Sequence, residues 1–388
     1  MMTRRAALAA ASTSLAALAA PRIADAFDSP FAASTTFAVV GPFSGPEKSG
    51  GEQLANGVRA AIEDANRSRG GLDRVYLLRT FDDENSVASA IVNSQFATSD
   101  GNVIAVIGHL GGHATDAALR TYGAAAMPVI VPASSYDKIT AGGYRNVFRL
   151  PTRDTDEGAL AARFVIDTLK PKNVYVLVVD GDYSYDVAQA FTERLSSQKI
   201  PWNSMLVSYD KPEFPKVAAT VLGAKPDYIY LCGATAEMGD IIPLLRQGGY
   251  TGALGAPQGF FTPETIRKYG AGVEGLTISS SMPYLAIAPA AYRIKTDFES
   301  RYGAFTPLSA FGYGSAQILM SAIKRSGAPN RLALARAIAT GGIFDTTVGS
   351  FTFSPTGDVI DPNVYFYTVR DGKWAFLRSA HPSSFLSK

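Results

Sequence analysis

The sequence predicts an α/β protein made of two lobes, each a doubly wound parallel sheet with helices on both faces. Segments with strand patterns alternate with helical segments along most of the chain, and strands joined by helices form parallel βαβ crossovers. About 360 of the 388 residues follow a predicted leader segment, which is more than one hydrophobic core usually supports. We therefore expect two cores.

The amino terminus has the pattern of a cleavable export signal over residues 1–26. A basic start, Met1-Met-Thr-Arg-Arg5, precedes an uncharged, apolar-leaning run from Ala6 to Ala20, and Ala24-Asp25-Ala26 fits a small-x-small cleavage site. The run is too short to span a membrane. The arginine pair resembles part of a twin-arginine signal, but Ala7 stands where that signal has an aromatic residue. The export route therefore stays open, and we expect a periplasmic protein.

Apolar segments with strand patterns alternate with amphipathic segments in a regular order. The first helical segment shows why these are helices, because Ala55, Val58, Ala61, Ile62 and Ala65 recur at spacings of three and four, as one buried face requires. The predicted strands are Thr36–Val40, Val75–Thr80, Val103–Ile107, Val129–Val131, Val174–Val178, Met205–Val207, Tyr228–Leu231 and Leu276–Ser279. The predicted helices are Glu52–Arg67, Val87–Ala97, Thr115–Ala124, Glu157–Leu169, Tyr185–Ser196, Pro215–Leu222 and Glu237–Gln247.

The carboxyl end has a different pattern from the rest of the chain. Phe351-Thr-Phe353, Val364–Val369 and Trp374–Leu377 are predicted to be short strands. Because Arg370-Asp-Gly372 supplies turn residues between the last two, they are predicted to form a hairpin.

Charge and cysteine content narrow the function. Without residues 1–26 the chain has 33 basic and 33 acidic residues, and this balance disfavours nucleic-acid binding through a basic surface. The single cysteine, Cys232, cannot form an internal disulfide. Its place in the apolar segment Tyr228-Ile-Tyr-Leu-Cys232 predicts a small buried core residue.

Motifs of catalysis and metal binding are absent or incomplete. There is no Walker A loop and no Gly-x-Ser-x-Gly elbow. His109, His113 and His381 have no cysteine or histidine at ligand spacing, so no zinc site is predicted. Asp82-Asp83-Glu84 fits a solvated turn, in which an acid caps the helix beginning near Ser86, better than a metal cluster. We expect a protein that is not an enzyme and that uses no metal or cofactor.

Two glycine-rich and hydroxyl-rich turns predict a binding site. Ile107-Gly-His-Leu-Gly-Gly-His-Ala-Thr115 and Met127-Pro-Val-Ile-Val-Pro-Ala-Ser-Ser135 each follow an apolar strand. Open α/β sheets bind ligands at the carboxyl ends of their strands, and uncapped amides at a helix start attract anions. The pattern predicts a small site for a carboxylate.

Several segments resemble the periplasmic leucine/isoleucine/valine-binding proteins, in the same order and over nearly the whole mature chain. They are Gly41-Pro-Phe-Ser-Gly-Pro46, Asn56-Gly57, Asp82-Asp83, Ile107-Gly-His-Leu110, Pro132-Ala133 and Glu237-Met-Gly239. The resemblance implies a type I periplasmic binding protein fold, in which two lobes joined by three crossovers close over a ligand. The crossovers would lie near Leu150–Asp154, Ser281–Tyr284 and Phe353–Asp358. Lobe one would then hold 35–150 and 284–352, and lobe two 151–283 and 355–380.

The resemblance also implies ligand contacts. On lobe one, Gly112 (normally a serine), Ala133 and Ser135 would grip the ligand's carboxylate, with Thr115 as a further hydroxyl. On lobe two, Tyr183 takes the family's tyrosine position. Gln258 falls where the family has the acid that receives the ligand's ammonium, in a turn with one extra residue.

Two large side chains of the family pattern are also missing, at Gly50 and Ala234. Their loss should enlarge the pocket, unless Tyr136, Phe260 or Phe261 refills it. Glutamine has no charge, so losing the acid should weaken ammonium binding by on the order of 1–3 kcal/mol. The ligand is therefore an amino acid, an aromatic or aliphatic carboxylate without an amine, or another small polar solute.

The resemblance implies a solute receptor that works with the permease and ATPase subunits of an ABC importer in the inner membrane, as a monomer. A ligand sensor on the same scaffold is the alternative, because fold does not fix function.

Overall fold

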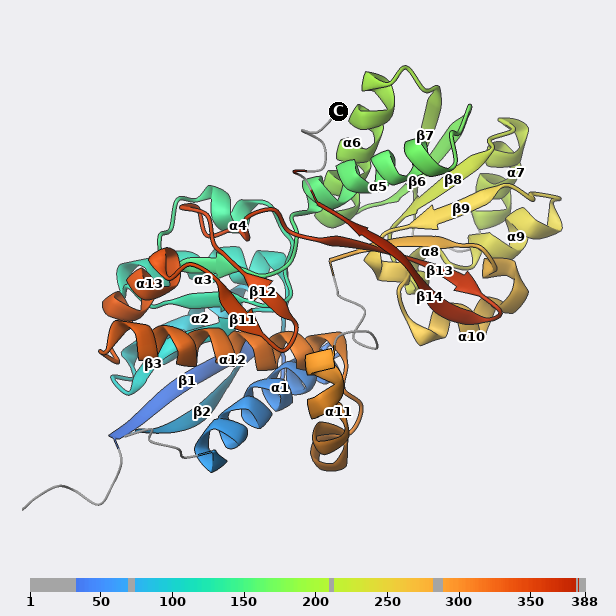
Figure 1. Ribbon diagram of the computed structural model, residues 1–388. Helices are drawn as coiled ribbons and strands as arrows, with labels where there is room; N and C mark the ends of the chain where they lie inside the picture. The colour runs from blue at the N-terminus through green and yellow to red at the C-terminus, as the bar shows by residue number, and fades with distance from the viewer. Residues whose placement is uncertain (1–32, 69–73, 209–212, 282–288, 382, 384–388) are drawn as a thin grey trace, which may run out of the picture.

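The computed structural model describes residues 33–68, 74–208, 213–281, 289–381 and 383. The predicted signal peptide, residues 1–26, lies outside the described residues. Figure 1 shows two α/β lobes side by side, with the strands β13 and β14 running along the second lobe. No helix in the described part of the chain is long and apolar enough to cross a membrane.

The first lobe contains a five-stranded sheet in which every pair of neighbouring strands is parallel. Its strand order is β2-β1-β3-β4-β5. The strands are β1 (Ala33–Gly41), β2 (Arg74–Asp82), β3 (Val103–Gly108), β4 (Val129–Val131) and β5 (Val147–Arg149). All four strands that the sequence predicts here are present, whereas β5 was not predicted.

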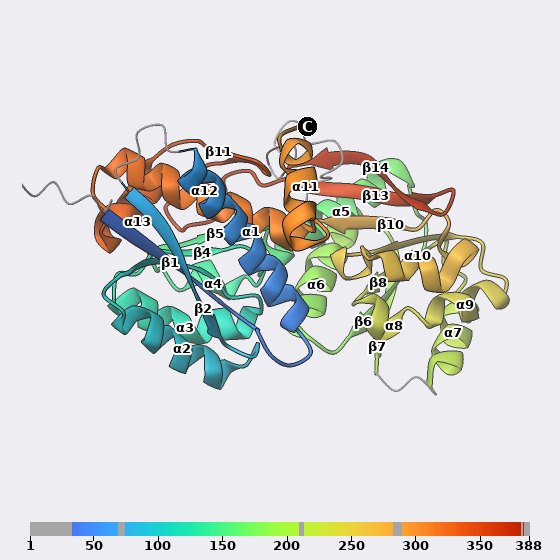
Figure 2. The ribbon, with the colours of Figure 1, turned by 90° about the horizontal axis from the view of Figure 1, so that it is seen from below.

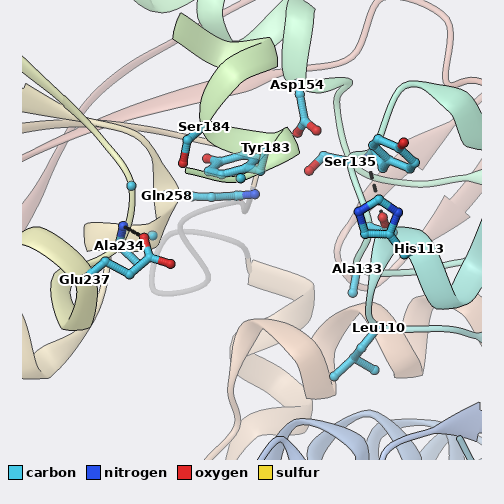
Figure 3. A pocket seen from close by; sticks show the side chains of 16 residues that line it. Leu110, His113, Ala133, Ser135, Asp154, Tyr183, Ser184, Ala234, Glu237 and Gln258 are labelled. Atoms are coloured by element: carbon cyan, nitrogen blue, oxygen red, sulfur yellow. Dashed lines mark hydrogen bonds between the residues drawn. The ribbon is translucent and has the colours of Figure 1, made fainter. Parts of the chain in front are cut away.

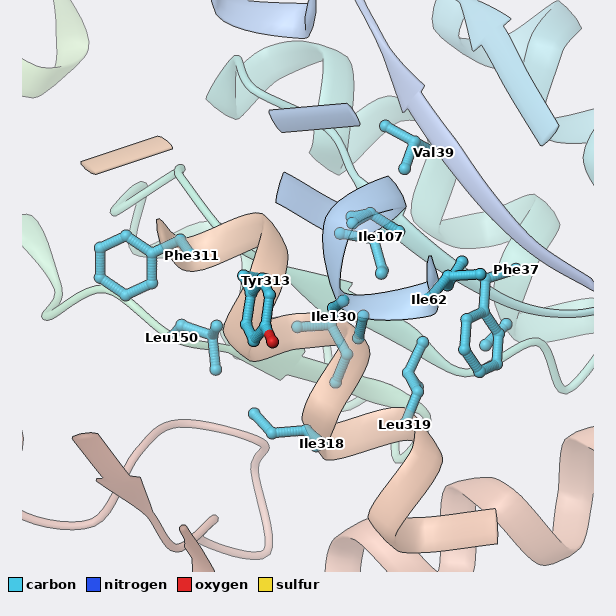
Figure 4. Close-up of a cluster of buried hydrophobic side chains, with 14 of the residues drawn as sticks. Phe37, Val39, Ile62, Ile107, Ile130, Leu150, Phe311, Tyr313, Ile318 and Leu319 are labelled. Carbon is cyan, nitrogen blue, oxygen red and sulfur yellow. The ribbon is translucent and has the colours of Figure 1, made fainter. Parts of the chain in front are cut away.

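Helices cover both faces of this sheet because its central strands are apolar on both sides. The helices are α1 (Lys48–Arg67), α2 (Val87–Ser99), α3 (Gly112–Ala124), α4 (Lys138–Ala141), α11 (Pro289–Tyr302), α12 (Pro307–Ser326) and α13 (Arg331–Thr340). On β1, Phe37 and Val39 face the core formed with α1 and α12 (Figure 4). Ala38 and Val40 face the core formed with α2 and α3. A short pair, β11 (Phe344–Thr346) and β12 (Gly349–Phe351), completes this part of the chain.

The second lobe contains a seven-stranded sheet with the order β14-β13-β10-β9-β8-β6-β7. Its strands are β6 (Val174–Val179), β7 (Trp202–Val207), β8 (Tyr228–Cys232), β9 (Ala253–Ala256), β10 (Thr277–Ser280), β13 (Val364–Arg370) and β14 (Lys373–Ala380). The strands from β6 to β10 pair in parallel, while β13 is antiparallel to both β10 and β14. The hairpin predicted at the carboxyl end is confirmed. Asp371 and Gly372, both with positive φ, form its two-residue turn.

The helices of the second lobe are α5 (Asp154–Thr168), α6 (Asp182–Ser197), α7 (Phe214–Gly223), α8 (Thr235–Met238), α9 (Ile241–Gln247) and α10 (Pro263–Tyr269), with 3-10 turns η2 (Gln258–Phe260) and η3 (Gly270–Val273). The single helix predicted over Glu237–Gln247 is wrong, because the chain forms α8 and α9 instead. Proline cannot donate a backbone hydrogen bond and clashes with the carbonyl four residues earlier. The restart at Ile241 places Pro243 in the first turn of a new helix, where proline is tolerated.

The two sheets share one plan. Without β13 and β14, the second sheet has the order β10-β9-β8-β6-β7, which matches the order of the first sheet read from β5 to β2. In each sheet the order reverses beside the first strand, and ligands of open α/β sheets bind at such a point, outside the carboxyl ends of the strands. Figure 2 shows the lobes from below, with the first lobe on the left and the second on the right.

Candidate functional site

One cleft receives the carboxyl ends of strands from both lobes. It has a volume of about 540 Å³, which is within the usual range for small-molecule sites. From lobe one it is lined by residues that follow β3 and β4, and from lobe two by residues that follow β6, β8 and β9 (Figure 3). The lining residues are Leu110, Gly112, His113, Ala133, Ser134, Ser135, Tyr136, Asp154, Gly181, Tyr183, Ser184, Gly233, Ala234, Glu237, Gln258 and Gly259.

The wall from lobe one offers hydrogen-bond donors without a formal charge. Helix α3 begins at Gly112 with no side-chain cap. The first helical bond runs from the Thr115 amide to the Gly111 carbonyl, so the Gly112 amide at the start of the helix makes no bond within the helix. Ser135 and Ala133 lie on the same wall. Such a helix start with adjacent hydroxyls suits a carboxylate.

Tyr136 occupies the space that a side chain at Gly112 would need. A Cβ atom added to Gly112 would lie 2.7 Å from the Cβ of Tyr136 and 3.0 Å from its Cγ. The ring of Tyr136 also packs at 5.2 Å, between centroids, from that of His113. The glycine and the tyrosine therefore fit one another, which explains why the serine of the family pattern is absent.

Two of the predicted contact residues do not line the cleft. Thr115 is fully buried, and its hydroxyl donates to the Gly111 carbonyl at 2.7 Å. Gly50 is covered by Leu110, whose Cδ2 would lie 2.7 Å from an added Cβ. Leu110 therefore takes the place of the missing aromatic residue, and the enlargement expected at Gly50 does not occur.

The wall from lobe two carries Tyr183, Gln258 and Ala234, as the family resemblance implied. The hydroxyl of Ser281 donates to the side-chain carbonyl of Gln258 at 2.9 Å. With its oxygen held in this way, the carboxamide presents its NH₂ group as the free end. Of the aromatic residues expected to refill the pocket, only Tyr136 lines it. Phe260 and Phe261 pack in the core of lobe two, where Phe261 stacks on Tyr367.

Glu237 is the carboxylate that the sequence prediction missed in this wall. One of its oxygens accepts a hydrogen bond from the Ala234 amide at 2.7 Å, and the side chain lines the cleft (Figure 3). It lies next to the position where the family's second tyrosine is missing. The segment Glu237-Met-Gly239 carried the resemblance, but nothing in its spacing showed that the acid faces a ligand.

A second carboxyl group, Glu157, lies behind this wall and is fully buried. It accepts hydrogen bonds from the Ser279 hydroxyl at 2.9 Å, from the Tyr183 hydroxyl at 3.3 Å and from the Gln258 amide at 3.4 Å. Burial raises the pKa of Glu157 to about 7, although these hydrogen bonds act in the opposite direction. Glu157 thus contacts Tyr183 and Gln258, the two predicted ligand contacts of lobe two, from the side away from the cleft.

Asp154 is the third acid missed by the sequence prediction. It lines the cleft from the first position of α5, is 1% exposed, and has one oxygen with no hydrogen-bond partner. Burial raises its pKa well above the usual range, while a hydrogen bond with Ser135 lowers it and the nearby acids raise it further.

Behind the wall from lobe one, Asp83 pairs with His109, and both are fully buried. The Asp83 carboxylate lies 2.5 Å from Nδ1 of His109, and Nε2 lies 2.9 Å from the Tyr122 hydroxyl. The prediction of a solvated acidic turn is therefore wrong for Asp83. The prediction that an acid caps the next helix is also wrong, since the hydroxyl of Ser86 accepts the capping bond from Ser89. Asp83 instead lies in the core, where its carboxylate contacts the imidazole of His109.

Arg149 links the cleft to the connections between the lobes. It is fully buried at the end of β5, and its guanidinium donates to the carbonyls of Ser135 and Tyr136 at 2.9 and 2.7 Å. The same group binds Asp358, which precedes β13, at 3.0 and 2.5 Å. Arg149 thus fixes the turn that carries Ser135 against the third predicted crossover. The second predicted crossover, Ser281–Tyr284, lies largely outside the described residues.

The chain resembles known proteins along most of its length. Residues 34–373 match the family described as periplasmic binding protein. The Leu/Ile/Val-binding protein of Citrobacter freundii is 26% identical over 339 residues, which cover 85% of this chain and 89% of that protein. The family match includes every segment that lines the cleft.

Solved structures share the fold. A leucine-binding protein from Thermotoga maritima is 25% identical and superposes with a TM-score of 0.78, covering 90% of this chain and 99% of that one. A solute-binding protein of an ABC transporter from R. palustris, in complex with benzoate, is 19% identical with a TM-score of 0.74, covering 90% of this chain and 97% of that one. The second likeness concerns the fold alone.

Proposed function

The chain belongs to the periplasmic binding protein family and has its type I fold, and we propose that it is the solute receptor of an ABC importer. Its relatives are binding proteins rather than enzymes. We propose residues 35–150 with 284–352 as lobe one and 151–283 with 355–380 as lobe two. The lobes would close over a small ligand by bending at the three connections between them.

The observation that carries this proposal is the division of polar groups across the cleft. Lobe one supplies uncapped amides at Gly112 and the hydroxyl of Ser135, whereas lobe two supplies Tyr183, Gln258 and Glu237. A small molecule with a carboxylate at one end would satisfy the donors of lobe one and reach lobe two with its other end. A ligand that contacts both lobes favours the closed form through its differential affinity.

An amino acid is the ligand class that we propose first. The family acid is absent at Gln258, but Glu237 supplies a carboxylate in the same wall, with one oxygen left after its bond to the Ala234 amide. A charge-assisted hydrogen bond to an ammonium is about twice as strong as a neutral one. Glu237 is therefore our candidate for the ammonium partner. The Leu/Ile/Val-binding relative supports this class.

A carboxylate without an amine is the second candidate, and one observation favours it. Ser281 holds the oxygen of the Gln258 carboxamide, so the group turned toward the cleft is a donor. A donor suits a hydroxyl or carboxylate oxygen and not an ammonium.

Titration calorimetry with leucine and with benzoate separates the two candidates. If the ligand is an amino acid, leucine binds to the unchanged protein, Glu237→Gln weakens it by roughly tenfold or more, which corresponds to about 1.4 kcal/mol, and Gln258→Glu is neutral or helpful. If the ligand lacks an amine, benzoate binds, Gln258→Glu prevents this by adding an unpaired charge, and Glu237→Gln has little effect.

The control is Glu264→Gln, on the exposed surface of α10 and away from the cleft, which should leave both titrations unchanged. If neither leucine nor benzoate binds, and no other small carboxylate does, the proposed receptor function is wrong.

Location and partners follow from the family. We propose that residues 1–26 are removed on export to the periplasm, and that the closed receptor docks on the permease subunits of the importer, which work with ATPase subunits. We propose that it acts as a monomer, without a cofactor. The sensor alternative has no structural observation in its favour.

A further inference from the structure

Three aspartates from three separate elements meet at the edge of the cleft. They are Asp137, in the turn after β4, Asp154, at the start of α5, and Asp186, in α6. One carboxylate oxygen from each lies within 4.8 Å of those of the other two. Among the described residues this is the only such group of three potential metal ligands.

The environment of Asp154 is unfavourable for an ionised carboxylate with nothing bound. The residue is 1% exposed, and its Oδ1 atom has no hydrogen-bond partner. Burying an unpaired charge is costly, and so is placing like charges close together. Its position at the amino end of α5 offsets this only partly, because the effect of the helix dipole is small beside the cost of burying an unpaired charge.

Hydrogen bonds from neighbouring groups hold two members of the cluster, Asp137 and Asp154, in place. Asp137 accepts a bond from the Thr155 hydroxyl at 2.6 Å, and the Asp154 amide donates to the Ser135 carbonyl at 3.2 Å. The adjacent guanidinium of Arg153 is bound by Asp156 through two bonds of 2.9 and 3.0 Å. Asp137 and Asp154 are thus positioned by neutral hydrogen-bond partners.

We propose that Asp137, Asp154 and Asp186 bind a calcium ion. Calcium takes carboxylate oxygens at about 2.3–2.6 Å, so its ligands lie up to about 5 Å apart, which covers the whole spread of this cluster. Magnesium binds at about 2.0–2.1 Å and would need all three oxygens within about 4.2 Å of one another. Waters would complete the coordination.

The ion would join segments on both sides of the first connection between the lobes. Asp137 precedes that connection, and Asp154 and Asp186 follow it. Because Asp154 also lines the cleft beside Ser135, the ion would place a positive charge near the group that we propose for the ligand's carboxylate. It would thereby remove the repulsion between an ionised Asp154 and an anionic ligand.

The test is thermal unfolding of the chelator-treated full chain, without any organic ligand, in calcium chloride, in magnesium chloride and in sodium chloride of equal ionic strength. A ligand that binds only the native state raises Tm by mass action. We expect calcium at millimolar concentration to raise Tm more than magnesium does, and sodium to have no such effect. The expected calcium affinity of Asp186→Asn is at least tenfold weaker.

Two further variants keep the test decisive. Asp116→Asn, at an exposed position of α3, should respond to calcium like the unchanged protein. Asp154→Asn should lose the calcium response, and its Tm in chelator should be at least as high as that of the unchanged protein, because an amide at this buried position cannot become charged. The proposal is overturned if calcium has no effect beyond that of sodium, or if Asp186→Asn and Asp154→Asn respond fully. Since no organic ligand is present, this outcome is independent of the receptor function.

Discussion

The two lobes repeat one strand order, yet they bury a carboxyl group behind the cleft in different ways. In lobe one, Asp83 is paired with His109, which in turn contacts Tyr122. In lobe two, Glu157 receives only neutral donors, among them Ser279 and Tyr183. Both carboxyl groups are fully buried. The repeated fold therefore sets where such a group lies, while its hydrogen-bond partners differ between the lobes.

The two buried carboxyl groups also differ in how directly they contact the residues that line the cleft. The pair in lobe one ends inside that lobe, whereas Glu157 bonds directly to Tyr183 and to the amide of Gln258, which line the cleft. A change in the charge of Glu157 would thus reach the ligand wall at once, while a change at Asp83 would act mainly on stability.

The largest effect is expected from breaking the pair in lobe one. His109→Leu leaves the buried Asp83 carboxylate without its imidazole, and breaking a buried pair in this way typically costs about 3–5 kcal/mol. Urea unfolding at pH 7 measures it. The double variant Asp83→Asn with His109→Leu has no buried carboxylate at this place. Its free energy of unfolding should therefore lie between those of His109→Leu and the unchanged protein. Equal stability of the single variant and the unchanged protein would contradict the comparison.

A pH-dependent effect is expected from Glu157→Gln. Burial raises the folded pKa of Glu157 from its ordinary value of 4.5 to about 7, so the native state binds this proton more tightly than the unfolded state does. Stability from this group is full below about pH 4.5 and is lost as pH rises to about 7, by roughly 3 kcal/mol. The free energy of unfolding, measured from pH 5 to pH 8, should fall less in Glu157→Gln than in the unchanged protein. If the free energies of unfolding of the two proteins change in parallel from pH 5 to pH 8, Glu157 is ionised throughout this range and the prediction is wrong.

The smallest effects compare the two helix starts that line the cleft. Gly112→Ser would force Tyr136 to move, and overpacking of this kind costs about 1–3 kcal/mol. A Cβ at Gly181, which precedes α6, meets nothing within 4 Å, so Gly181→Ser should be neutral or stabilise by up to about 1 kcal/mol as an N-cap. Thermal unfolding of both variants checks this contrast. A tolerated serine at Gly112 would show that the two turns are equally open.

Much of the fold could be predicted because its central strands β3, β4, β6 and β8 are apolar and buried on both faces. Strand β5 was missed because it ends in a charged residue, Arg149, whose burial depends on the distant Asp358. Strand β9 was missed because Ala253-Leu-Gly-Ala256 has little strand propensity. Gly255 is required there by a distant contact, as an added Cβ would lie 1.7 Å from the Tyr228 hydroxyl. Such requirements are set by tertiary packing and leave no local pattern.

Only those parts of the candidate site that lie in local motifs could be predicted from the sequence. The placement of Gly112, Ser135, Tyr183 and Gln258 at one cleft agrees with the motif-based expectation. Partners far apart in the chain were not predicted. Glu157 is 122 residues from Ser279, and Asp83 is 26 residues from His109. Charge and hydropathy patterns do not reveal which distant polar groups will be neighbours.

The pairing of β13 with β10 has a consequence for the order in which the protein can form during synthesis. Strand β10 ends at Ser280, but its antiparallel neighbour begins only at Val364. Until β13 has left the ribosome, β10 remains an edge strand with unpaired backbone groups on one side. Such edges promote aggregation. In the first lobe α1 likewise packs against α12, more than 230 residues later. Neither lobe can therefore complete its sheet or its core before these later segments have been made.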